Sequence, residues 1–142
     1  MVVPVHGDVS IRWCDRVCLS IINGAFNEAG MARWFELVQQ HWQQQGEPTE
    51  WASVLDMQHW QGRTPECEAL MREAVAWSMA HGLRFRILLL ERGPDNIYFK
   101  LTQKANPVIP PNSNIAICQN YDEVVEALQQ HGFSVSRECL MP

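Results

Sequence analysis

The first part of the chain alternates apolar and polar side chains with the period of a half-buried strand. Residues 9–13 follow this alternation, and residues 17–22 are more continuously apolar. Residues 14–16 lie between the two runs and can turn the chain, so the pattern predicts a β-hairpin. Asn23-Gly24 is expected to end the second strand.

A helix is predicted next, because apolar side chains then recur every three or four residues. They form one stripe: Met31, Trp34, Phe35 and Val38, which Trp42 extends. Asn27 is the expected N-cap, since its side-chain oxygen can accept hydrogen bonds from free N–H groups of the first turn. Phe26 and Met31 fall at the hydrophobic-staple positions around that cap. Gly46 and Pro48 are expected to end the helix.

The middle of the chain predicts a strand, a loop and a second long helix. Residues 51–56 form a short buried strand, and a loop follows through Gly62. Thr64 is expected to cap the helix, with Pro65 at its first position and Glu66 in its first turn. The apolar face of this helix consists of Cys67, Leu70, Met71, Ala74, Val75 and Ser78. Gly82 is expected to stop it.

Residues 85–90 predict a further apolar strand, in which Arg86 indicates a solvated face near the start. Residues 97–104 fit a short helix or a strand, and we favour the helix. The proline-rich residues 106–112 are expected to be irregular, and residues 115–118 form a last short strand.

A final helix is predicted from a capping box and an apolar stripe. Asn120 and Glu123 have capping-box spacing. The stripe consists of Val124, Val125 and Leu128. Gly132 is expected to end the helix, and residues 133–135 are expected to add a terminal strand.

After the hairpin, strands and helices alternate, which requires a largely parallel sheet with right-handed crossovers. The fold class is therefore α/β: a mostly parallel central sheet begun by an N-terminal β-hairpin and flanked by helices. With 142 residues, 46% of them hydrophobic, the chain has the size of one domain, 1–142.

Charge and targeting signals narrow the class of partner. The chain has 11 Lys and Arg against 16 Asp and Glu, a formal net charge of -5, and no basic cluster. Nucleic acids and anionic membranes are therefore disfavoured as partners. The N-terminus shows no signal-peptide pattern, and the longest aliphatic run, residues 87–90, is too short for a membrane span. We expect a cytoplasmic protein that is not integral to a membrane.

The cysteines are interpreted as reduced thiols. Their number is odd and they are scattered through the chain: Cys14, Cys18, Cys67, Cys118 and Cys139. Cys14 and Cys18 are separated by three residues at a hairpin, with no paired Cys-x-x-Cys or nearby histidine, so no metal site is expected.

Candidate chemistry gathers after the strand at residues 51–56. Asp56, His59 and Trp60 follow the carboxyl end of this strand, where ligand sites of open α/β sheets collect. An Asp–His pair can perform acid–base chemistry, but no nucleophile accompanies it, so catalysis is not expected. His41, His81 and His131 lie near helix C-termini, where the helix dipole favours an imidazolium. Phosphate-binding glycine motifs and a Gly-x-Ser-x-Gly elbow are absent from the sequence, and no cofactor is predicted.

Six tryptophans are many for a chain of this length: Trp13, Trp34, Trp42, Trp51, Trp60 and Trp77. Trp42 and Trp77 fall off the main helical stripes, and Trp60 lies in the expected loop. These side chains can pack helix edges together, or they can form an apolar surface for a second protomer, a protein partner or a lipid-like ligand.

The order and lengths of these elements resemble the STAS domain family, and among its members the SpoIIAA-like, anti-sigma factor antagonist-like proteins. The resemblance covers residues 8–132. Val54-Leu55-Asp56 is similar to the end of the central strand in that family, and the helix at residues 65–80 corresponds to its second helix. Residues 115–128 resemble the strand and acidic-start helix that close such domains.

One motif departs from the family pattern. The antagonists carry a phosphorylatable serine after an aspartate at the start of the second helix, whereas this chain has Arg63-Thr64-Pro65-Glu66. Thr64 offers the only hydroxyl in this stretch, and we expect it to cap the helix rather than accept a phosphate.

These observations favour a non-enzymatic cytoplasmic regulatory or interaction module of STAS/SpoIIAA-like type, acting through contact with a protein partner or a second copy. The expected binding surface consists of Asp56, His59, Trp60, Arg63 and Thr64. The alternative is a carrier of a small apolar ligand or lipid, with residues 96–114 as a lid. An enzyme using Asp56, His59 and Thr64 is the third hypothesis.

Overall fold

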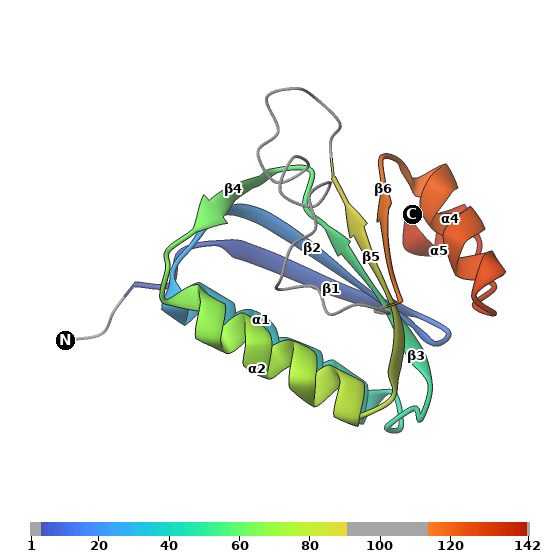
Figure 1. The fold of residues 1–142 in the computed structure, drawn as a ribbon, viewed down its shortest axis with the longest axis horizontal. Coiled ribbons are helices and arrows are strands. Elements are labelled where there is room, and N and C mark those ends of the chain that lie inside the picture. The colour runs from blue at the N-terminus through green and yellow to red at the C-terminus, as the bar shows by residue number, and fades with distance from the viewer. Residues whose placement is uncertain (1–3, 91–113, 142) are drawn as a thin grey trace.

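The computed structural model describes residues 4–90 and 114–141, which form a six-stranded sheet with helices on both faces (Figure 1). The strands are β1 (Asp8–Cys14), β2 (Val17–Phe26), β3 (Trp51–Asp56), β4 (Trp60–Arg63), β5 (Leu83–Leu89) and β6 (Ile115–Cys118). Their order across the sheet is β1-β2-β3-β5-β6, and β4 pairs with the end of β2. The pair β1–β2 is antiparallel and all other pairs are parallel, so the predicted hairpin and α/β class are confirmed.

Helices α1 (Glu28–Gln44) and α2 (Cys67–Ala80) lie side by side on one face of the sheet. Helices α4 (Tyr121–Gln130) and α5 (Arg137–Leu140) cover the other face (Figure 1). The largest apolar cluster lies under α4 and α5 and includes Val17, Leu19, Val54, Phe85, Ile87, Val124, Leu128 and Leu140. Two smaller clusters lie under α1 and α2.

Two of the three predicted side-chain caps, those at Asn27 and Asn120, are present. The Asn27 side chain accepts a hydrogen bond from the Gly30 N–H at 2.9 Å. The Asn120 side chain accepts one from the Glu123 N–H, also at 2.9 Å. Gly46, just beyond α1, has a φ of +85°, a value that glycine adopts without steric strain. These local signals therefore set the helix starts, and glycine ends α1 as expected.

Strand β2 continues beyond its predicted end. It passes through Gly24, where the register with β4 shifts, and reaches Phe26. The free backbone groups at this end of β2 pair with Trp60–Arg63, so a segment predicted to be a loop is a strand. Helix α2 begins at Cys67, two residues after its predicted start at Pro65.

The C-terminal segment also differs from the prediction. Residues 133–135 are not a strand; they lead into the short helix α5, whose Ser136 side chain accepts a hydrogen bond from the Cys139 N–H. Arg86 in β5 is half-buried, and burial lowers the pKa of its guanidinium, so the solvated face predicted there is only partly solvated. The predictions for residues 97–104 and 106–112 lie outside the described residues.

The prediction of five reduced thiols is wrong for one pair, because Cys14 and Cys139 form a disulfide that ties α5 to β1. Cys18, Cys67 and Cys118 are free and buried. Burial raises the pKa of the Cys18 thiol to about 12. Burial, together with the charge of Glu123, raises that of Cys118 to about 11.

Within the described residues, no helix has the length and apolar character needed to cross a membrane. The cytoplasmic location stays a prediction.

Replacing Cys139 with serine is expected to lower the free energy of unfolding, because the disulfide joins residues 125 positions apart. Closing a loop of that length restricts the unfolded chain, and its loss typically lowers stability by about 2–5 kcal/mol. Denaturant melts of the wild type and of Cys139→Ser, with and without a dithiol reductant, measure this difference. Only the wild type should respond to the reductant, and equal midpoints without reductant would contradict the bond.

Candidate functional site

Asp56 ends β3, and its carboxylate holds two parts of the fold together. The side chain is buried, with 8% of its surface exposed. One carboxylate oxygen accepts a hydrogen bond from the Gln58 N–H at 3.1 Å. The other accepts one from the hydroxyl of Tyr121, the first residue of α4, at 2.5 Å. Burial and then the hydrogen bond and charge of Asp56 raise the pKa of Tyr121. Asp56 therefore joins β3 to α4.

His59 is exposed and contributes to the fold through its backbone. Its carbonyl accepts a hydrogen bond from the Gly24 N–H at 3.0 Å, which fixes the chain ahead of β4. Among the described residues, the His59 ring makes no hydrogen bond with Asp56, whose carboxylate already has two partners. The two side chains are thus not arranged as an acid–base pair.

Trp60 is the first residue of β4 and is half-buried. Its ring packs against the apolar cluster formed by Ile22, Phe26, Met31 and Cys67. This cluster lies where β2 and β4 meet the start of α1 and α2. Trp60 therefore supports the segment that leads into α2.

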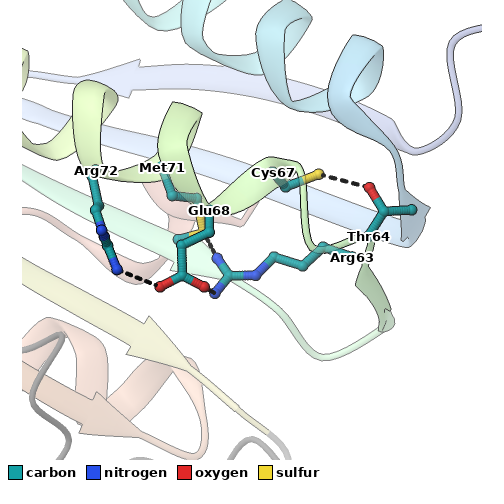
Figure 2. Close-up of polar contacts among 6 residues, drawn as sticks. All are labelled: Arg63, Thr64, Cys67, Glu68, Met71 and Arg72. Atoms are coloured by element: carbon teal, nitrogen blue, oxygen red, sulfur yellow. Dashed lines mark hydrogen bonds and ion pairs between the residues drawn. The ribbon is translucent and has the colours of Figure 1, made fainter.

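Arg63, the last residue of β4, joins a charged network on the first turns of α2 (Figure 2). Its guanidinium lies 3.6 Å from a Glu68 carboxylate oxygen and also contacts the Met71 sulfur. Arg72 binds the other Glu68 oxygen at 3.0 Å. The exposed fractions of these side chains are 26% for Arg63, 40% for Glu68 and 69% for Arg72. The network presents a solvent-facing row of alternating charges.

Thr64 connects β4 to α2 without the predicted side-chain cap. Its N–H donates to the Phe26 carbonyl at 3.0 Å, and its carbonyl accepts from the Cys67 N–H at 3.1 Å. The hydroxyl lies 3.6 Å from the Cys67 sulfur (Figure 2). No cap hydrogen bond from a side chain is present at the start of α2.

The Thr64 hydroxyl also contacts the carboxylate of the exposed Glu66. Hydrogen bonds from its own backbone N–H and from the Thr64 side chain lower the pKa of Glu66. The hydroxyl of Thr64 is therefore engaged by a carboxylate and a thiol rather than by a helix N–H.

The five predicted surface residues thus divide into two groups. His59, Trp60, Arg63 and Thr64 lie just before β4, along it and at its junction with α2, whereas Asp56 turns toward α4. Sequence reasoning missed Tyr121, Glu68 and Arg72. The spacing of Glu68 and Arg72, four residues apart on a helix, is a local signal for an ion pair. No local signal marks Tyr121, which is 65 residues from Asp56.

Comparison with known proteins identifies the fold. No family model matches the sequence, and no curated protein matches it. Among solved structures, the chain is similar to an uncharacterized protein of the DUF3478 family with a SpoIIAA-like fold from Shewanella loihica PV-4. The TM-score is 0.57 at 8% sequence identity, over 89% of this chain and 97% of that one. The fold is therefore SpoIIAA-like, as the resemblance to STAS domains implied.

Replacing Tyr121 with phenylalanine is expected to lower the free energy of unfolding by about 2 kcal/mol at neutral pH, as loss of a hydrogen bond to a charged group does. Above about pH 10 the unfolded wild type loses the tyrosine proton while the folded state, with its raised pKa, keeps it. Wild-type stability then falls as pH rises, and the variant lacks this loss. In denaturant melts from pH 7 to pH 11, the difference in free energy of unfolding between wild type and variant should become smaller as pH rises. A difference that stays constant would contradict the hydrogen bond.

Replacing Trp60 with alanine is expected to lower the free energy of unfolding by about 2 kcal/mol, since the ring is half-buried and leaves a partial cavity. A denaturant melt measures it, with Trp60→Phe as the control that retains an aromatic ring. A loss below about 0.5 kcal/mol, the size of ordinary surface substitutions, would show that the cluster does not depend on the ring.

Proposed function

We propose that this protein is a non-enzymatic, STAS-like module that acts through contact with a protein partner or a second copy of itself. The contact surface, here called the β4–α2 surface, consists of His59, Thr64, Pro65, Glu66 and Arg72. All five side chains are exposed. This exposed set on a fixed backbone is the observation that carries the proposal.

The backbone under this surface is held on both sides. Residues Gly24–Phe26 of β2 pair with β4 in parallel, and Phe26 also accepts the Thr64 N–H. Cys67, fully buried, places its sulfur 3.7 Å from the Phe26 carbonyl. A rigid scaffold that presents exposed polar side chains at a strand–helix junction is typical of a recognition surface.

The arrangement near β3 supports a role without catalysis. Asp56 is hydrogen-bonded to Tyr121 and to the Gln58 N–H, and it does not orient the His59 ring. The described residues also contain no group of three or more His, Cys, Asp or Glu side chains placed to hold a metal.

The residues of the β4–α2 surface also support the proposal that the module acts without the phosphorylatable serine of the antagonists. Pro65 stands at the corresponding helix start, and the Thr64 hydroxyl already contacts Glu66 and Cys67. A phosphate on Thr64 would lie beside the Glu66 carboxylate, and the like charges would repel.

The alternative of an apolar-ligand carrier receives less support. A pocket of about 570 Å³ lies beside the last turns of α1 and α2, and five of its eight lining side chains are glutamate or glutamine. Native mass spectrometry of the freshly purified protein distinguishes the two: a co-purifying lipid would favour the carrier.

A photo-crosslinking amino acid in place of Glu66 is expected to capture a protein partner or a second copy in cells that express the protein naturally. The same amino acid at Gln129, an exposed position on α4, is the matched control. Adding Arg72→Glu should reduce the crosslink at least about threefold, because it reverses a charge on the surface. Mass spectrometry of the products measures the yield.

Equal crosslinking at both positions would contradict the proposed surface. A measured turnover that disappears in His59→Ala would contradict the non-enzymatic role.

A further inference from the structure

A second solvent-facing site lies at the opposite ends of α1 and α2 from the β4–α2 surface. The pocket of about 570 Å³ is lined by residues from the second half of α1, the turn after it, and the end of α2. They are Glu36, Gln39, Gln40, Trp42, Gln43, Glu47, Trp77 and His81. The lining combines aromatic rings, amides and carboxylates, and contains no Lys or Arg.

Three rings form a corner within this lining. The Trp77 indole and the His81 imidazole are stacked, with centroids 4.3 Å apart and an angle of 18° between their planes. The Trp42 indole stands nearly perpendicular to both, at 83° to Trp77 and 85° to His81. Two nearly perpendicular aromatic walls are thus present in one pocket.

Hydrogen bonds fix the orientation of these rings. The Trp42 indole N–H donates to the Pro48 carbonyl at 3.1 Å. The His81 Nδ1–H donates to the Trp77 carbonyl at 2.7 Å, since a carbonyl can only accept. The Trp42 N–H is therefore already paired, so what this ring can offer a ligand is its electron-rich π surface.

Two carboxylates, those of Glu36 and Glu47, supply negative charge around the corner. Glu36 accepts a hydrogen bond from the Gln40 amide at 3.1 Å, and neither Glu36 nor Glu47 forms an ion pair with a described residue. Helix α1 ends at Gln44 and helix α2 at Ala80, so the negative ends of two helix dipoles lie at this site.

We propose that this pocket binds a small organic cation that carries an alkylated ammonium group, of the trimethylammonium type. The rings of Trp42 and Trp77 attract the cation through their quadrupoles, and Glu36 and Glu47 supply the counter-charge. A bare metal ion fits this lining poorly, since only two of its eight side chains are carboxylates and the described residues contain no group of three or more His, Cys, Asp or Glu placed to hold one. The inference is independent of the proposed contact surface.

The first experiment separates charge from shape. The protein is titrated with choline, with tetramethylammonium, and with 3,3-dimethyl-1-butanol, the uncharged carbon isostere of choline, and binding is followed by tryptophan fluorescence and by NMR. Sodium chloride at matched ionic strength is the control for screening. Choline is expected to bind at least about tenfold more tightly than the neutral isostere. Equal affinity for the two, or no saturable binding of choline, would overturn the proposal.

The second experiment assigns the binding to the pocket. Glu36→Gln and Glu47→Gln remove one charge each while keeping shape, and each is expected to weaken choline binding about threefold or more. Glu73→Gln, on an exposed position of α2 outside the pocket, is the matched control and should leave the affinity unchanged. Trp42→Phe should weaken binding because phenylalanine has a weaker quadrupole, with circular dichroism used to verify that the variant is folded. Equal effects of all three glutamate variants would overturn the assignment.

A third measurement distinguishes a free ligand from a lipid headgroup, since both carry the same cation. Phosphatidylcholine vesicles are sedimented with the protein, with and without free choline. If the ligand is a lipid headgroup, the protein should sediment with the vesicles and free choline should release it. If the ligand is a free small molecule, the protein should bind choline without sedimenting with the vesicles. Vesicle binding that choline does not compete would contradict the pocket as the binding site.

Discussion

The pairing of β2 with three other strands determines where everything else in this protein lies. Its partner β1 is antiparallel, whereas β3 and β4 are parallel to it, and a parallel partner requires the chain to cross over the sheet. The crossovers contain α1 and α2, and their common hand places both helices on one face, running in the same direction (Figure 1). The N-terminal ends of α1 and α2 therefore lie near β4. Their C-terminal ends lie together on the same face, at the opposite end of the helix pair. Both candidate surfaces follow from this arrangement.

The sequence predicts those parts of the fold that depend on neighbours in the chain. The cap at Asn27 and the apolar stripe that follows are local, and so is the capping-box start at Asn120. Strand β4 could not be predicted in this way. Its four residues include Gly62 and have no apolar alternation; they become a strand because the end of β2 offers free backbone groups. The disulfide partner of Cys14 is likewise determined by the position of α5, which no local pattern indicates.

The candidate site shows the same division between local and distant effects. Asp56 occupies the strand end where ligand sites collect, but a tyrosine 65 residues later in the chain takes up its carboxylate. Thr64 has the residue type of an N-cap, yet the helix begins at Cys67 and the hydroxyl bonds elsewhere. Residue type and position along a strand thus indicate where polar groups gather. Which of them remain available to a partner depends on contacts that form only in the folded chain.

The separation of 125 residues between Cys14 and Cys139 also bears on how the protein is made. Strand β1 leaves the ribosome well before α5, which is joined to it through Cys139. At about 5–20 residues per second, synthesis of the intervening chain takes on the order of ten seconds. During that time β1, an edge strand of the sheet, lacks its contacts with α5. The bond can close only after nearly the whole described chain has emerged, so it preserves a finished fold rather than guiding the first steps toward it.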